Sequence, residues 1–132
     1  MTKEQPSLHV GIAEFSEPTF LLIGESYSFH WLAEQIAARR TFTLEQTLGK
    51  AHASLRFVPT TQGGHLSRKG DALEWAISVI EAQQATQQLK ELAASNCPAH
   101  AYLDPLSNET DVQIVASIGE YDPNQFDAAR DI

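Results

Sequence analysis

The stretch Leu8-His-Val-Gly-Ile-Ala13, followed after a short break by Phe20-Leu-Leu-Ile-Gly24, carries the clearest fold signal in the sequence. In the first segment the large apolar side chains stand at every second position, which is typical of a strand with one buried face. Pro18 interrupts the pattern, because proline removes a backbone donor and restricts the residue before it. The two segments are therefore predicted to form an antiparallel pair of strands.

The residues that follow Gly24 change to a helical period. Ser26 or Ser28 is available as an N-cap, and Arg39 and Arg40 stand where the helix dipole favours cations. An amphipathic helix of about three turns is predicted here. Its apolar positions are Phe29, Leu32, Ala33, Ile36 and Ala37.

The segment from 41 to 61 fits two structures. Phe42 and Leu44 alternate as in a strand, while Thr43-Leu-Glu-Gln46 also fits a capping box that opens a short helix. Leu55 and Phe57 predict a strand that ends at Pro59. Residues 60–70 contain three glycines and predict a mobile loop.

A long second helix is predicted from Asp71 to Ala94. Asp71 and Glu74 form a start that resembles a capping box, and a helical apolar period continues beyond it to Leu92. Trp31 and Trp75 each stand beside the apolar stripe of their predicted helices, where a tryptophan either closes the edge of a core or anchors a partner.

After Pro98, residues 99–104 and 112–118 predict a second hairpin, joined by a polar connection rich in turn formers. From Asp122 the chain has no apolar run and is expected to be a loose tail. The sequence thus predicts a single α+β domain over residues 1–132, with a mainly antiparallel sheet of hairpins and two helices packed on one face.

The charge of the chain limits its partners. Seventeen acidic and nine basic side chains give a formal net charge of −8, which would repel a phosphate backbone. Acidic residues gather in the last third, and the charge either serves solubility or forms a surface for a basic protein partner. The residues expected to bind such a partner are Asp104, Glu109, Asp111, Glu120 and Asp122.

Neither a membrane span nor a secretory leader is expected, because no apolar run approaches about 20 residues and no apolar segment follows Lys3. A cytoplasmic protein is therefore expected.

The sequence predicts no catalytic site, metal site or cofactor. Cys97, His100 and Asp104 could be imagined as a thiol, base and carboxylate, but Cys97 falls at the predicted carboxyl end of a helix, where the dipole disfavours a thiolate. The five histidines include no HExxH pattern. Gly63-Gly64 has neither the glycine spacing nor the lysine of a phosphate-binding loop.

Two segments carry a resemblance to a known class of proteins. The stretch Phe20-Leu-Leu-Ile-Gly-Glu-Ser26, which runs into Phe29-His-Trp-Leu-Ala-Glu-Gln-Ile36, and the later Ala99-His-Ala-Tyr-Leu-Asp-Pro105, which precedes a final strand, resemble small bacterial immunity proteins of polymorphic toxin systems. The resemblance covers about a third of the chain. It implies a non-catalytic inhibitor that binds a cognate toxin in the cytoplasm.

Two alternatives from other classes remain. The first is a small enzyme or ligand-binding domain with a site around His100 and Asp104, which a pocket gathering histidines and carboxylates would favour. The second is a homodimeric structural protein, which would present a large apolar interface.

Overall fold

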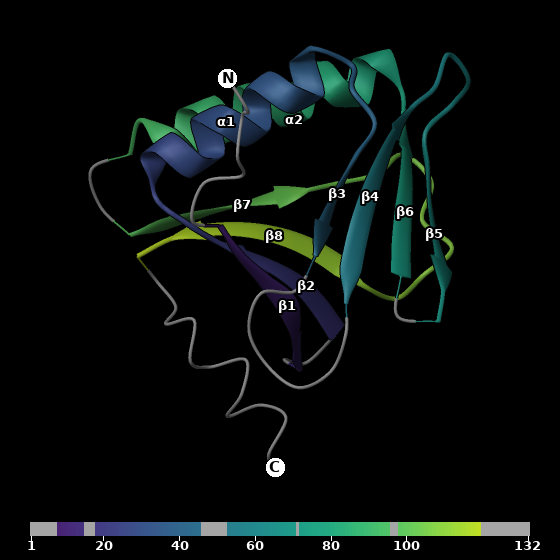
Figure 1. Ribbon diagram of the computed structural model, residues 1–132, viewed down its shortest axis with the longest axis horizontal. Helices are drawn as coiled ribbons and strands as arrows, with labels where there is room; N and C mark the ends of the chain where they lie inside the picture. Colours follow the sequence, from purple (N-terminus) through teal and green to yellow (C-terminus); the bar gives the residue numbers. More distant parts are fainter. Residues whose placement is uncertain (1–7, 15–17, 46–52, 71, 96–97, 120–132) are drawn as a thin grey trace.

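The computed structural model describes residues 8–14, 18–45, 53–70, 72–95 and 98–119. The elements within these ranges follow the order β1 (His9–Glu14), β2 (Pro18–Ile23), α1 (Ser26–Ala37), β3 (Phe42–Glu45), β4 (Ser54–Pro59), β5 (His65–Lys69), β6 (Ala72–Ile77), α2 (Val79–Ala93), β7 (Ala99–Leu103) and β8 (Gln113–Ile118). The predicted α+β class is confirmed (Figure 1).

The strands form two mixed sheets, with the orders β1-β2-β8-β7 and β3-β4-β6-β5. The outer pairs of each sheet are antiparallel, and these include both predicted hairpins, β1 with β2 and β7 with β8. The central pairs, β2 with β8 and β4 with β6, are parallel. A parallel pair joins strands that are distant in sequence, so its partners cannot be identified from local periodicity.

The element order is the series β-β-α-β-β given twice, once from β1 to β4 and once from β5 to β8. Each half supplies two strands to each sheet, and the central parallel pairs always join one half to the other. The side chains do not repeat with the elements: β2 contains Phe20-Leu-Leu-Ile23, whereas the corresponding part of β6 is Leu73-Glu-Trp-Ala76. For this reason the duplication is not visible as a sequence repeat.

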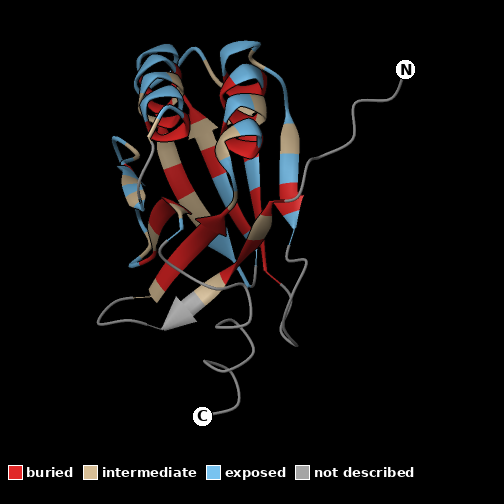
Figure 2. Cartoon of the chain, turned by 90° about the vertical axis from the view of Figure 1, so that its left-hand side faces the viewer, coloured by how far each residue is buried: buried red, intermediate tan, exposed pale blue. Residues whose placement is uncertain are grey.

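The two helices lie side by side and cover one side of the sheets, with their buried faces turned inward (Figures 1 and 2). The sheets also meet along their edges. β1 lies beside β3, and Leu66 of β5 forms a parallel bridge with Asn108. One continuous apolar core includes residues of both halves, both sheets and both helices.

An aromatic row crosses this core from α1 to β6. Trp31 packs edge-on against Phe42 with ring centroids 6.1 Å apart, Phe42 stacks on Phe57 at 4.7 Å, and Phe57 lies 5.7 Å from Trp75. Trp75 is only 1% exposed. Both tryptophans therefore contribute to core packing, which is the first of the two roles considered for them.

The prediction of a helix from residue 71 to residue 94 was wrong over its first turns. Ala72–Ile77 is strand β6, and the helix begins only at Val79. Leu73, Trp75 and Ile77 are buried and alternate with less buried residues, which is the strand period. Over so short a stretch the apolar residues also fit helical spacing, so the sequence alone could not distinguish a strand from a helix.

The prediction of a mobile loop over residues 60–70 was also wrong, since His65–Lys69 forms strand β5 with Leu66 fully buried. Of the two structures considered after residue 41, the strand is present, as Phe42–Glu45. Residues 46–52 and the expected tail from Asp122 lie outside the described residues. No helix in the described ranges is long and apolar enough to cross a bilayer.

Candidate functional site

The amino end of α2 is held by a buried carboxylate. Ser78 is the N-cap, and its hydroxyl accepts a hydrogen bond from the Glu81 N–H at 3.2 Å, while Glu81 Oε1 accepts from the Ser78 N–H at 2.8 Å. This reciprocal capping box satisfies two donors that a helix start leaves unpaired. The helix thus begins with a capping box at Ser78 and Glu81, after β6, and not at Asp71 and Glu74 as predicted.

The Glu81 carboxylate also joins α2 to two other parts of the fold. Its Oε2 atom accepts hydrogen bonds from the Trp75 indole N–H at 3.2 Å and from the Leu106 N–H at 2.6 Å. Glu81 is only 1% exposed, and these bonds offset the cost of burying its charge. The helix start is therefore fixed to β6 and to the connection that follows β7.

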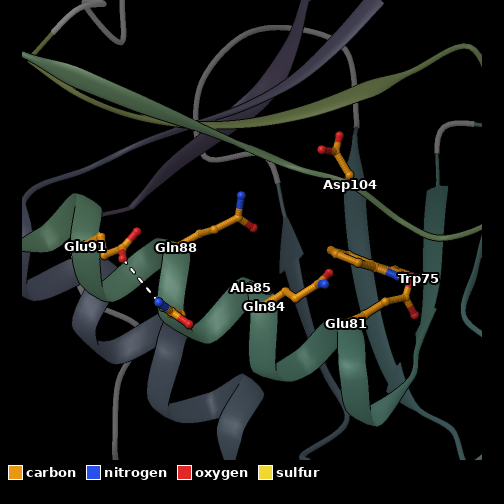
Figure 3. A pocket seen from close by; sticks show the side chains of 8 residues that line it. Trp75, Glu81, Gln84, Ala85, Gln88, Glu91 and Asp104 are labelled. Atoms are coloured by element: carbon orange, nitrogen blue, oxygen red, sulfur yellow. Dashed lines mark hydrogen bonds between the residues drawn. The ribbon is translucent and has the colours of Figure 1, made fainter.

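A hollow of about 270 Å³ opens between α2 and the end of β7 (Figure 3). Gln88 projects from α2 toward β7 and donates to the Tyr102 carbonyl at 2.9 Å, and Asp104 lies across the hollow. None of the described residues that line it is basic. We call it the acidic hollow; its principal lining residues are Trp75, Glu81, Gln84, Gln88, Glu91 and Asp104.

A second depression, of about 730 Å³, follows the crease between α2 and the carboxyl end of α1. Its lining is much more strongly apolar than that of the acidic hollow, where polar and apolar surface are nearly equal. Gln87 and Glu91 line both depressions and so form the ridge between them. We call this second depression the helix groove; its principal lining residues are Ala37, Arg39, Val79, Ala82, Thr86 and Ala94.

Arg39 forms one end of the helix groove and closes α1. Its backbone φ is +56°, and the bonds from Arg39 N to Ile36 O and from Arg40 N to Gln35 O are those of a Schellman motif, in which glycine usually occupies this position. The Arg39 guanidinium donates to the carbonyls of Ser78 at 3.1 Å and Thr60 at 2.9 Å. It therefore links the end of α1 to the ends of β6 and β4.

The five acidic residues expected to bind a partner do not all fall in one place that the structure describes. Asp104 lines the acidic hollow. Glu109 lies where the β7–β8 connection meets β5, with its carboxylate 3.6 Å from the His65 ring. Asp111 is exposed in the same connection and lines neither the acidic hollow nor the helix groove, so we base the proposals below on Asp104 and treat Asp111 as an acidic position outside the binding surface. Glu120 and Asp122 lie outside the described residues.

The structure also brings together residues that sequence reasoning did not connect. His65 Nδ1 lies 2.9 Å from Ser107 Oγ, and His65 Nε2 faces Glu109. The bridge between Leu66 and Asn108 positions all three side chains, because Ser107 and Glu109 flank Asn108. The group resembles a nucleophile, base and carboxylate, but the His65 and Glu109 side chains are 42% and 56% exposed, and His65 lines neither of the two depressions described above.

The structure does not bring His100 and Asp104 together in one pocket, as the alternative site would require. Asp104 faces the acidic hollow, whereas His100 does not line it and packs edge-on against Tyr102 at 5.4 Å. Cys97 lies outside the described residues. Among the residues that the structure describes, no three histidine, cysteine or acidic side chains are arranged to hold a metal ion.

Comparisons of this chain with protein-family models, with curated proteins and with solved structures found no match.

Proposed function

We propose that this protein is a non-catalytic immunity protein, which binds a cognate bacterial toxin in the cytoplasm and blocks it. The observation that carries the proposal is the acidic hollow, where Asp104 and Glu91 face a concave surface that has no basic lining residue within the described part of the chain. Asp104 is also the acidic residue within the turn that resembles immunity proteins.

The electrostatics of the hollow support capture of a basic protein. Glu81 is already satisfied by its hydrogen bonds, whereas Asp104 and Glu91 are exposed to a partner. Glu91 accepts one hydrogen bond, from Gln87 Nε2 at 3.3 Å, and keeps acceptor sites for a further donor. Three of the arginines are engaged within the chain: Arg39 on two carbonyls, Arg40 on Gln35 and Arg68 on the Gly70 carbonyl. The net charge of −8 would attract a basic surface over a distance and raise the rate of association.

The side chains that line the acidic hollow support binding more than catalysis. Besides Trp75 and Ala85, the described residues that line the hollow are amides and carboxylates and include no histidine, so the hollow offers hydrogen-bond acceptors for arginine or lysine side chains. If the toxin is a nuclease, the same carboxylates would stand in for the phosphates of its substrate.

The proposal is tested by expressing each protein encoded beside this one in a bacterial host, with and without this chain. We expect one neighbouring product to arrest growth, this protein to restore growth, and the two proteins to elute together after purification. Asp104→Lys and Asp111→Lys change the net charge equally, but only Asp104 lines the acidic hollow. Comparing the two variants therefore distinguishes an effect of the hollow from an effect of net charge. If none of the neighbouring products is toxic or is bound, the proposal is wrong.

A further inference from the structure

We infer that the helix groove and the acidic hollow form one docking surface astride α2, and that its occupant is an amphipathic helix with a basic edge. The partner's identity as a toxin rests on the proposed function, but the chemistry of the occupant does not. The inference rests on the two depressions sharing Gln87 and Glu91 as their common ridge.

The helix groove has the chemistry of a seat for an apolar helix face. Ala37, Ala82 and Ala94 contribute short apolar side chains to its lining, and the exposed Val79 extends the apolar surface at one end. The longer side chains of Gln83, Gln87 and Lys90 also line it. Thr86 also lines the groove, and its hydroxyl is buried without a hydrogen-bond partner. An apolar helix laid between two others is a common mode of peptide recognition.

The length of the groove defines the occupant. Along α2 it runs from Val79 to Ala94, a rise of about 22 Å at 1.5 Å per residue. A partner helix of about 15 residues, roughly four turns, would span it. Leucine-like side chains at helical spacing on two or three turns of this partner helix would fill the helix groove.

The charges on the two sides of α2 define the orientation of this helix. On the side of the hollow, Glu91 and Asp104 favour arginine or lysine at the edge of the incoming helix. Within the groove itself, Lys90 of α2 and Arg39 at one end disfavour further basic residues. The surface therefore selects a helix with an apolar centre and its basic residues on one edge only.

The acidic hollow lies at a position where the side chains of the two halves of the chain differ. Trp31 and Gln84 are each the sixth residue of their helices, so they occupy corresponding positions in the two halves. Trp31 packs against Phe42 of β3, whereas Gln84 lines the hollow beside β7. The duplicated architecture does not impose an opening here; the side chains of the second half create it.

The test uses synthetic peptides of about 15 residues, a length chosen to span the groove. The first has leucines at helical spacing and arginines on one edge. The second has the same composition in scrambled order, and the third has glutamates in place of the arginines. In nitrogen-15 NMR titrations we expect the first peptide to shift the amides of Ala37, Thr86, Lys90 and Asp104, and to bind at least about tenfold more tightly than either control.

Matched variants locate the binding. Ala37→Glu adds a charge in the groove, while Ala38→Glu adds it at the next exposed position, which does not line the groove. We expect only Ala37→Glu to abolish the shifts, and Asp104→Lys but not Asp111→Lys to remove the preference for arginine over glutamate. The inference is overturned if the first peptide does not bind, if the amides it shifts lie mainly outside residues 26–39, 78–95 and 99–106, or if the scrambled peptide binds equally well. A neighbouring toxin that is bound elsewhere would overturn the docking surface and leave the proposed function intact.

Discussion

At the scale of single residues, the close approach of Gly64 to Glu81 is a tight steric constraint. A Cβ atom at Gly64 would collide with the Glu81 carboxylate, whereas a Cβ at Gly63 would meet nothing within 4 Å. Glu81 cannot move aside without losing its bonds to Ser78, Trp75 and Leu106. Neither glycine has a positive φ, so steric contact alone distinguishes the two positions.

We expect Gly64→Ala to lower the free energy of unfolding by about 2 kcal/mol, in the range of overpacked sites, and Gly63→Ala to change it by less than about 0.5 kcal/mol. Urea denaturation of the two variants measures this difference. Equal stabilities would show that the carboxylate is not fixed in the way the hydrogen bonds indicate.

Arg39 combines an unfavourable backbone conformation with two favourable side-chain bonds. Arg39→Ala removes the bonds to Ser78 and Thr60 and keeps the strain of the positive φ, while Arg39→Gly removes both. We expect the glycine variant to be more stable than the alanine variant by about 1 kcal/mol. Thermal unfolding of both proteins checks the order, and a more stable alanine variant would contradict the left-handed C-terminal turn of α1.

At the scale of elements, the junction between β6 and α2 depends on the capping box. We expect Ser78→Ala to cost about 1 kcal/mol of stability, as for other N-caps, and Glu81→Ala to cost about 3 kcal/mol, because three donors then lose their acceptor. Glu74→Ala, an exposed acidic position on β6, is the matched control and should be nearly neutral. Urea denaturation would contradict this account if Glu81→Ala were no more damaging than Glu74→Ala.

The same junction shows how far element prediction from the sequence could go. The hairpins β1–β2 and β7–β8 and the first helix were predictable, since their periods are distinct and their boundaries carry glycine or proline. β6 was missed because Leu73, Trp75 and Ile77 run directly into a helix with no glycine or proline between them. β5 was missed because only Leu66 within it is buried, so it has no alternating apolar signal.

At the scale of the whole molecule, neither half of the chain can complete a sheet by itself. The central parallel pairs β2–β8 and β4–β6 join the halves, and the core draws on both. Thr61, Gln62 and Gly63, between β4 and β5, are exposed, so the chain can be divided there without cutting an element.

We expect each half alone to be unfolded by circular dichroism, and the two halves produced together to reassemble and elute as one complex. A half that folds as a stable monomer would contradict the shared core. Reassembly that yields no ordered near-ultraviolet signal from Trp31 and Trp75 would contradict the aromatic row.

The candidate site was only partly predictable. Asp104 was among the residues expected to bind a partner, because acidic residues gather in the last third of the chain. The hollow around it was not predicted, since it depends on Gln84, Gln88 and Glu91 of a helix facing the end of β7. The contact between His65 and Ser107 likewise joins residues 42 positions apart through a bridge that leaves no sequence signal.

The most direct test of the central claim is the affinity of this protein for the neighbouring gene product that arrests growth in the expression test, measured by calorimetry for the wild type, Asp104→Lys and Asp111→Lys. If the acidic hollow holds a basic side chain of the toxin, Asp104→Lys should raise the Kd by about 100-fold, and Asp111→Lys by less than about threefold. An Asp104→Lys variant that binds as tightly as the wild type would contradict the account.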